Sequence, residues 1–135
     1  MDKLARKAPS IRAYGVKAPV VFAPNVQVTH FKSWRDTYGY YKPMMHALKS
    51  QPNIGEVIFM PNIVSPVATI EERSKQLAAS LERTRNELKS DERVHLVTHS
   101  FGGVDARAAI SLHDADENIQ SLTTIATPHT GLRLI

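Results

Sequence analysis

The chain has 135 residues, of which 42% are hydrophobic and 22% charged, and this fits one globular domain with one core. Its formal net charge of +4 comes from scattered Lys and Arg without interleaved aromatic residues, which argues against a nucleic-acid-binding protein. The chain contains no cysteine, so disulfides, zinc–thiolate sites and a cysteine nucleophile are excluded.

The first 17 residues are basic, and we expect them to form an exposed, poorly ordered leader. They lack the apolar run of a secretory signal, and Pro9 breaks what would otherwise resemble a mitochondrial presequence. No apolar run approaches the ~20 residues that span a bilayer. The sequence favours mitochondria or cytoplasm without fixing the compartment, and it leaves peripheral contact with an anionic membrane surface open.

Residues 18–135 are predicted to form one domain in which apolar strands alternate with helices. In its first half, β-rich apolar runs predict strands at 18–23 and 56–60. A helix is predicted between them, at about 43–49, with a proline in its first turn. The segment before that helix is predicted to be a loop, which contains Trp34, Asp36 and Gly39.

The clearest helix starts after Thr69. Thr69 and Glu72 have the T-x-x-E spacing of a capping box, in which two side chains satisfy free backbone N–H groups at a helix start. Apolar residues then fall on one helical face and Glu and Arg on the other; the apolar ones are Ile70, Leu77, Leu81 and Leu88. Ser90 and Asp91 are expected to end the helix.

The second half continues the alternation. A third strand is predicted at 93–98, a helix then runs to about residue 112, and a polar connection at 113–118 leads to a fourth strand at 119–126. Near-continuous apolar strands alternating with helices are typical of a parallel sheet with helices on both faces. We therefore expect an α/β fold.

The most informative stretch is VHLVTHSFGG, where a strand is followed at once by a helix. This is the layout of a nucleophile elbow, in which a serine on a sharp turn presents its hydroxyl above the sheet. Ser100 is the candidate nucleophile, and the N–H of Phe101 would point at a developing oxyanion. Small residues are needed two positions away, a requirement that Gly102 meets and Thr98 meets less well. The alternative is that Ser100 only caps the following helix.

Four histidines are candidates for the base that a serine nucleophile requires. His99 adjoins the serine but should point elsewhere, and His95 lies inside the third strand, where a structural role is expected. His113 lies among acidic residues without metal-ligand spacing, so we expect a solvated loop and no metal site. His129 lies at the same sheet edge as Ser100, and we interpret it as a loop-structuring residue.

Two segments, VHLVTHSFGGVDAR and SLTTIATPHTG, resemble the triacylglycerol lipases of the α/β-hydrolase superfamily, above all the fungal mitochondrial-type lipases and their bacterial relatives. The likeness covers about residues 18–131. It implies a partial α/β-hydrolase fold with four mainly parallel strands in the order 2-1-3-4, and no cofactor. It also implies that Ser100 forms the acyl-enzyme and that the oxyanion hole uses backbone N–H groups.

Two features depart from the lipase pattern. Family members carry a His-Gly pair after the first strand, where this chain has Pro24 and Asn25, so Val26 is the matching oxyanion donor. The family's acid and histidine follow the T-P-H segment, and no matching Asp or His is found before Ile135. The resemblance is therefore to the N-terminal half of such a lipase.

The sequence thus predicts a lipase-like serine hydrolase that acts on carboxylic esters of acylglycerols through Ser100 and is inactive alone. The alternative is a non-catalytic α/β-hydrolase-like protein that binds a ligand or a partner. In either case the last strand would leave an uncovered sheet edge, through which the chain could associate with itself.

Overall fold

The computed structural model describes residues 18–27, 34–52, 54–60, 62–65, 67–88 and 91–131, with backbone only at 25–27, 34–37 and 62–64. The predicted leader at residues 1–17 lies outside the described residues. Within them, no helix is both long and apolar enough to cross a membrane.

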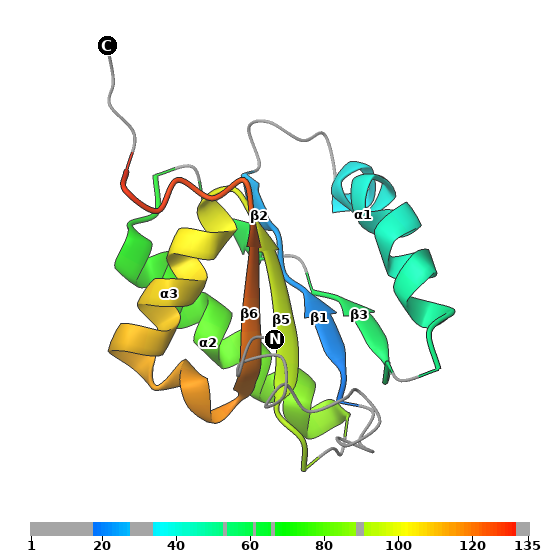
Figure 1. Ribbon diagram of the computed structural model, residues 1–135. Helices are drawn as coiled ribbons and strands as arrows, with labels where there is room; N and C mark the ends of the chain where they lie inside the picture. Colours follow the sequence, from blue (N-terminus) through cyan, green and yellow to red (C-terminus); the bar gives the residue numbers. More distant parts are fainter. Residues whose placement is uncertain are drawn as a thin grey trace, which may run out of the picture.

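The centre of the molecule is a four-stranded parallel sheet (Figure 1). Its strands are β1 (Val20–Phe22), β3 (Val57–Phe59), β5 (Val94–His99) and β6 (Ile119–Ile125), and they lie in the order β3-β1-β5-β6. All three pairings are parallel. The predicted α/β class and the order 2-1-3-4 are therefore confirmed, and all four strands fall inside or within one residue of the predicted runs.

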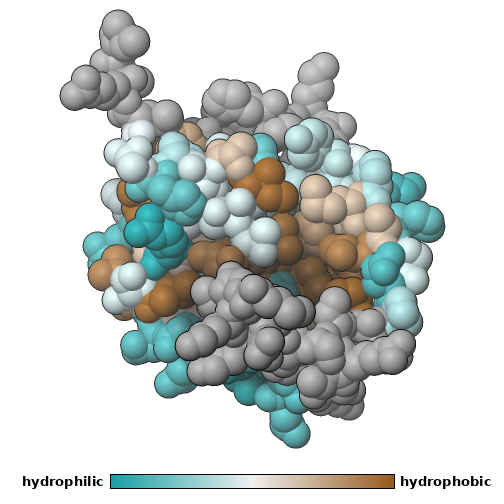
Figure 2. All heavy atoms as spheres, in the orientation of Figure 1, coloured by the Kyte–Doolittle hydropathy of each residue, from teal (hydrophilic) through white to brown (hydrophobic). Residues whose placement is uncertain are grey.

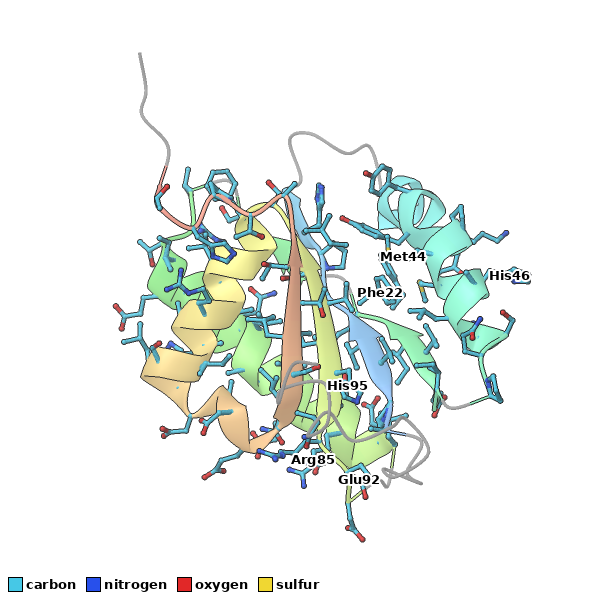
Figure 3. The ribbon with its side chains drawn as sticks, in the orientation of Figure 1. Phe22, Met44, His46, Arg85, Glu92 and His95 are labelled. Carbon is cyan, nitrogen blue, oxygen red and sulfur yellow. The ribbon has the colours of Figure 1, made fainter. Side chains whose placement is uncertain are left out.

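Helices cover both faces of this sheet. Helix α1 (Trp34–Lys49) lies on one face, whereas α2 (Ile70–Glu87) and α3 (Phe101–His113) lie on the other (Figure 1). The alternation along β1 shows the division, because Val20 and Phe22 join the α1 cluster while Val21 and Ala23 join the α2–α3 cluster. Phe22 projects from β1 toward α1 (Figure 3), and its ring centroid lies 6.1 Å from that of Tyr41.

The start of α1 corrects the sequence prediction. Trp34, Asp36 and Gly39, which were predicted to lie in a loop, are helical, and Pro43 lies inside the helix instead of in its first turn. The apolar spacing that supports the longer helix is present in the sequence, since Tyr38, Tyr41, Met45 and Leu48 all pack on the β1–β3 side. Tertiary packing of that face thus overrides the local cost of the proline.

Helix α2 begins as predicted. Thr69 is its N-cap and forms the full capping box with Glu72: the Glu72 N–H donates to Thr69 Oγ1 at 3.1 Å, and the Thr69 N–H donates to Glu72 Oε2 at 2.7 Å. Leu77 and Leu81 are fully buried, as their spacing indicates. Ile70 is 47% exposed instead, and Leu88 is the C-cap, so the predicted apolar face holds only over the middle of the helix.

Two features of the fold were not predicted. β2 (Asn25–Gln27) and β4 (Asn62–Val64) form a separate two-stranded parallel sheet. A short 3-10 helix, η2 (Ala115–Glu117), lies in the polar connection before β6. Asp114 precedes it with a left-handed φ of 51°, a conformation that Asp tolerates better than most residues.

Among the described residues, the helices cover the sheet less completely on the α1 side. Helix α1 packs over β3 and β1, and Figure 2 shows an apolar strip over the middle of the sheet, between α1 and α3. Ser121 and Thr123 of β6 are exposed. Within the described residues β6 pairs only with β5, so β6 is an edge strand.

Candidate active site

Ser100 lies at the junction of β5 and α3. The strand ends at His99, the helix begins at Phe101, and Ser100 between them has φ 55° and ψ −130°. Positive φ is uncommon for a residue with a side chain, and holding such a conformation costs about 1–3 kcal/mol. This strained strand-to-helix turn has the shape of a nucleophile elbow, at the position where the sequence places it.

The capping alternative for Ser100 is not what the structure shows. Ser100 occupies the N-cap position of α3, but its side chain makes no capping hydrogen bond. An ordinary N-cap residue has extended backbone angles, as Thr69 does at φ −72° and ψ 164°. The Ser100 hydroxyl is therefore not committed to the helix end.

Neighbouring backbone and side chains hold the strained conformation. The Ser100 N–H donates to the carbonyl oxygen of Ile125 at 2.9 Å. The Ser100 carbonyl oxygen accepts from Thr127 Oγ1 at 2.9 Å and from the Gly103 N–H at 3.1 Å. Both backbone polar groups of Ser100 are thus satisfied, and two of the three contacts come from the chain at and just after β6.

The tightest approach in the elbow involves Gly103. A Cβ atom at this position would lie 2.6 Å from Cγ2 of Thr127 and 2.9 Å from its Cβ, which is too close for any side chain. Gly102, the small residue that the motif identifies, is buried in the first turn of α3. Sequence reasoning missed the role of Gly103, because its neighbour Thr127 is distant in sequence.

Thr98, the other flanking residue of the motif, is 2% exposed. Its Oγ1 has no hydrogen-bond partner among the described residues. A buried hydroxyl without a partner costs about 1–3 kcal/mol. Thr98 is therefore accommodated beside Ser100, but its buried hydroxyl carries an energetic cost.

The two expected oxyanion donors follow the carboxyl ends of two neighbouring strands, β1 and β5. Phe101 is the first residue of α3, so its N–H has no acceptor within the helix and lies at the positive end of the helix dipole. Val26 lies in β2, four residues past Phe22, and Phe22 pairs with Val97 of β5. Because the carboxyl ends of adjacent parallel strands meet at one edge, Val26 and Ser100 leave the sheet on the same side.

His99 faces away from the helix-α3 side of the sheet, as predicted. Its ring centroid lies 5.8 Å from that of Tyr40 and 5.9 Å from that of Tyr41, both on α1. Tyr41 is 4% exposed, and this burial, followed by the nearby Tyr40, raises the pKa of the Tyr41 hydroxyl. The His99 ring thus packs against the two tyrosines of α1.

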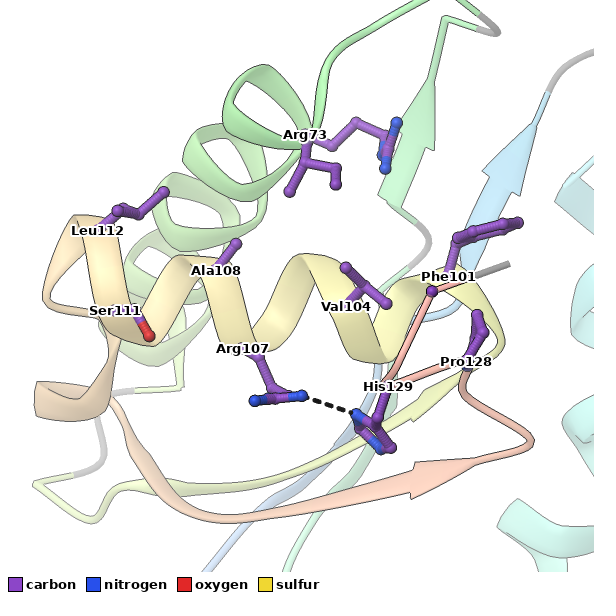
Figure 4. Close-up of a pocket in the computed structure, with 11 residues that line it drawn as sticks. Arg73, Phe101, Val104, Arg107, Ala108, Ser111, Leu112, Pro128 and His129 are labelled. Atoms are coloured by element: carbon purple, nitrogen blue, oxygen red, sulfur yellow. Dashed lines mark hydrogen bonds between the residues drawn. The ribbon is translucent and has the colours of Figure 1, made fainter. Parts of the chain in front are cut away.

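His129 bridges α3 and β6 (Figure 4). Its Nδ1 lies 3.2 Å from Nη1 of Arg107, and its Nε2 lies 2.9 Å from Oγ1 of Thr124. A guanidinium can only donate, so Nδ1 accepts and the proton is on Nε2, which donates to Thr124. Both ring nitrogens are engaged, which fits the loop-structuring role that we expected for this residue.

The two other candidate histidines, His95 and His113, have hydrogen-bond partners. His95 Nδ1 lies 2.7 Å from Ser121 Oγ across the β5–β6 pair. His113 Nε2 lies 3.1 Å from Ser74 Oγ, and that hydroxyl donates to the Glu71 carbonyl, so it accepts from His113. No group of three His, Cys, Asp or Glu side chains suited to a metal ion occurs in the described part of the chain.

A groove of about 720 Å³ runs along the outer side of α3 (Figure 4). It extends from Phe101 to Leu112 and is bordered by Ile70 of α2 and by the segment from Pro128 to Gly131. Arg107 and His129 lie on its wall. The groove reaches the residue after Ser100 but not Ser100 itself.

Comparison with known proteins places these observations in a family. The family model for palmitoyl protein thioesterase matches residues 19–135. The chain is 40% identical over 67 residues to triacylglycerol lipase 2 of Saccharomyces cerevisiae, a match that covers 47% of this chain and 21% of the yeast protein.

Solved structures agree on the fold. The mature form of the Bacillus licheniformis lipase BlEst2 superposes with a TM-score of 0.64 at 23% identity, covering 85% of this chain and 42% of the lipase. The propeptide form gives the same TM-score and identity over 23% of its length. The chain therefore has a partial α/β-hydrolase fold and spans less than half the length of these relatives.

Proposed function

Because this chain belongs to the palmitoyl protein thioesterase family of lipase-like hydrolases, we propose that it carries the nucleophile of a serine hydrolase that cleaves fatty-acyl esters. The conformation of Ser100 carries the proposal: a serine with φ 55°, at a strand-to-helix junction, with its hydroxyl free of the helix cap. Folding would not need such strain, so a use for the presented hydroxyl is the simplest reason for keeping it.

In the proposed reaction, Ser100 Oγ attacks the ester carbonyl, and a histidine base takes its proton. The carbonyl oxygen becomes an oxyanion that the N–H groups of Phe101 and Val26 stabilise; one such donor is worth about 3 kcal/mol. The tetrahedral intermediate expels the alcohol, which takes a proton from the histidine, and leaves an acyl group on Ser100. Water then hydrolyses this acyl-enzyme.

We propose carboxylic esters of acylglycerols as the substrates. The yeast relative is named a triacylglycerol lipase and the Bacillus structures are named lipases, and these names support an oxygen ester. The family model is named for a thioesterase. Both substrate types pass through the same acyl-enzyme, so Ser100 has the same role in either case.

The base and the acid of the proposed triad are not found near Ser100 among the described residues. His99 packs on tyrosines, His129 is held between Arg107 and Thr124, and Asp105 is paired with Arg73. The proposal therefore requires both groups from outside the described residues. The same observation, together with Pro24 and Asn25 in place of His-Gly, favours the second candidate, a non-catalytic hydrolase-like binding protein.

A chimera separates the two candidates. The matching stretch of the yeast lipase is replaced by that of this chain, and hydrolysis of a triacylglycerol and of an acyl thioester is measured. We expect hydrolysis that Ser100→Ala lowers by at least ~10³-fold. A folded chimera with no activity, or with activity unaffected by Ser100→Ala, would favour the binding protein.

A further inference from the structure

We propose that Thr127 is a positioning residue for Ser100: its hydroxyl keeps the elbow serine in the strained conformation that presents Oγ. This inference rests on the proposed nucleophile role of Ser100. It concerns a residue in the segment after β6, outside the elbow motif itself.

The first argument is the hydrogen bond between them. Thr127 Oγ1 donates to the carbonyl oxygen of Ser100 at 2.9 Å. The other two contacts of the Ser100 backbone, with the Ile125 carbonyl and the Gly103 N–H, are made by main-chain atoms. A residue with φ 55° keeps this conformation only when its surroundings stabilise it. Thr127 contributes a side-chain hydrogen bond to that stabilisation.

The second argument is steric. The Thr127 side chain occupies the space where Gly103 would otherwise carry a Cβ atom, with Cγ2 at 2.6 Å and Cβ at 2.9 Å from that point. The first turn of α3 and the segment after β6 therefore interlock. The missing Cβ of Gly103 therefore lets the Thr127 side chain come close enough for its hydroxyl to reach the Ser100 carbonyl.

The third argument is the path of the chain before Thr127. Ala126 has φ 49°, a left-handed conformation that a residue with a side chain rarely adopts. It lies between Ile125, whose carbonyl accepts the Ser100 N–H, and Thr127, whose hydroxyl reaches the Ser100 carbonyl. The bend at Ala126 thus lets Ile125 and Thr127 form hydrogen bonds with the N–H and the carbonyl oxygen of Ser100, respectively.

The absence of cysteine from the chain provides a direct test. Ser100→Cys introduces one thiol at the elbow, and its rate of alkylation by iodoacetamide is measured across pH. A thiol at a helix N-terminus has a lowered pKa, so both the thiol pKa and the alkylation rate report how the backbone holds the side chain at this position. Thr127→Val, which keeps the shape, and Thr127→Ser, which keeps the hydroxyl, are then compared in this background.

We expect Thr127→Ser to match the parent, and Thr127→Val to slow alkylation by roughly fivefold, with the thiol pKa moving toward its ordinary value. The loss of one hydrogen bond worth about 1 kcal/mol lowers the population of the conformation that presents the side chain by about this factor. Thr130→Val, at an exposed position of the same segment, is the control and should have no effect. If Thr127→Val does not fold, Thr127→Ala is measured in its place.

A folded Val or Ala variant with unchanged rate and thiol pKa overturns the proposal. An equal loss in the Ser variant also overturns it, because the hydroxyl would then not be the group that matters. Thermal unfolding of each variant separates lost stability from lost positioning. The alkylation assay measures no ester hydrolysis, so its result is independent of the chimera experiment. The positioning role of Thr127 can therefore be overturned while the chimera is active, and it can be supported while the chimera is inactive.

Discussion

Arg73 on α2 forms an ion pair with Asp105 on α3. Its Nε lies 2.9 Å from one carboxylate oxygen of Asp105 and 3.1 Å from the other, and its Nη1 donates to the Ala68 carbonyl at 2.7 Å. The Asp105 side chain is 0% exposed and that of Arg73 12%. The ion pair therefore fixes the helix that carries the elbow against α2, in surroundings with little water.

Asp105→Ala should lower the free energy of unfolding by about 3–5 kcal/mol, because it leaves the Arg73 guanidinium poorly compensated in a buried site. The double variant Arg73→Met/Asp105→Leu should lose less stability than the sum of the losses in Arg73→Met and in Asp105→Leu. Urea unfolding of these two single variants, of the double variant and of Asp105→Ala measures the losses and the coupling. Additive losses would show that the two residues act independently.

Two glycine-to-alanine changes should have opposite effects. Gly103→Ala should destabilise the chain by about 1–3 kcal/mol or more, since the new methyl group would collide with Thr127. Gly39→Ala should stabilise it by about 1 kcal/mol, because a Cβ there meets nothing within 4 Å and alanine favours the interior of α1. Thermal unfolding measures both, and a stable Gly103→Ala variant would mean that the elbow is looser than described.

Part of the stability that the chain loses on acidification should come from Glu72. The hydrogen bond from the Thr69 backbone, followed by that from its hydroxyl, lowers the pKa of the Glu72 carboxyl in the folded chain. The contribution of Glu72 is therefore fully present above the unfolded-state value of about 4.3 and is lost as pH falls through the folded-state pKa.

The difference in unfolding free energy between the parent and Glu72→Gln should thus be constant near neutral pH and shrink below pH about 4.3. Urea titrations at several pH values measure it. Glu71→Gln removes a carboxylate from the same helical turn without touching the capping box, and so controls for the loss of charge at the helix start. A difference that does not vary with pH would contradict the assignment.

The purified chain should hydrolyse short-chain nitrophenyl esters little or not at all. The histidines nearest to the elbow are engaged by other groups, and a serine without a base is a weak nucleophile. An oxyanion hole alone leaves an acceleration over water of roughly 10³–10⁴, provided that Val26 is well placed. Robust turnover that Ser100→Ala abolishes would reveal a base that we have not identified.

The chain should associate with itself through β6. This strand carries no charged side chain over Ile119–Ile125, and within the described residues its outer edge is unpaired. Such an edge favours pairing with another chain. Sedimentation at micromolar concentrations should show dimers or larger species, and Gln120→Lys with Thr123→Lys, both at exposed positions, should shift the chain toward monomer. A parent chain that sediments as a clean monomer would contradict this expectation.

The sheet and the elbow were predictable because their signals are local. A strand of alternating burial runs directly into a glycine-rich helix start at Ser100, and the T-x-x-E box fixes the start of α2 within a few residues. The alternation of strands and helices predicted a parallel sheet, and the resemblance to lipases supplied the strand order. None of these steps required knowledge of distant contacts.

The features that were missed depend on such contacts. The first turns of α1 are stabilised by packing of Tyr38 and Tyr41 on the sheet, which outweighs the local signals of Gly39 and Pro43. The β2–β4 pair joins two three-residue segments that are too short to be recognised alone. The requirement for Gly103 becomes visible only when Thr127 is placed beside it.

The central place of β1 also constrains how the chain can fold. β1 is the first strand in sequence, yet both of its neighbours, β3 and β5, follow much later. Two of the three hydrogen bonds to the Ser100 backbone also come from residues of and after β6. Contacts between distant segments slow folding, because the entropy of closing the long intervening loop is lost before the contact stabilises the chain. During synthesis, the elbow would therefore be completed only after Thr127 has emerged, so the proposed nucleophile is among the last parts of this sheet to reach its final shape.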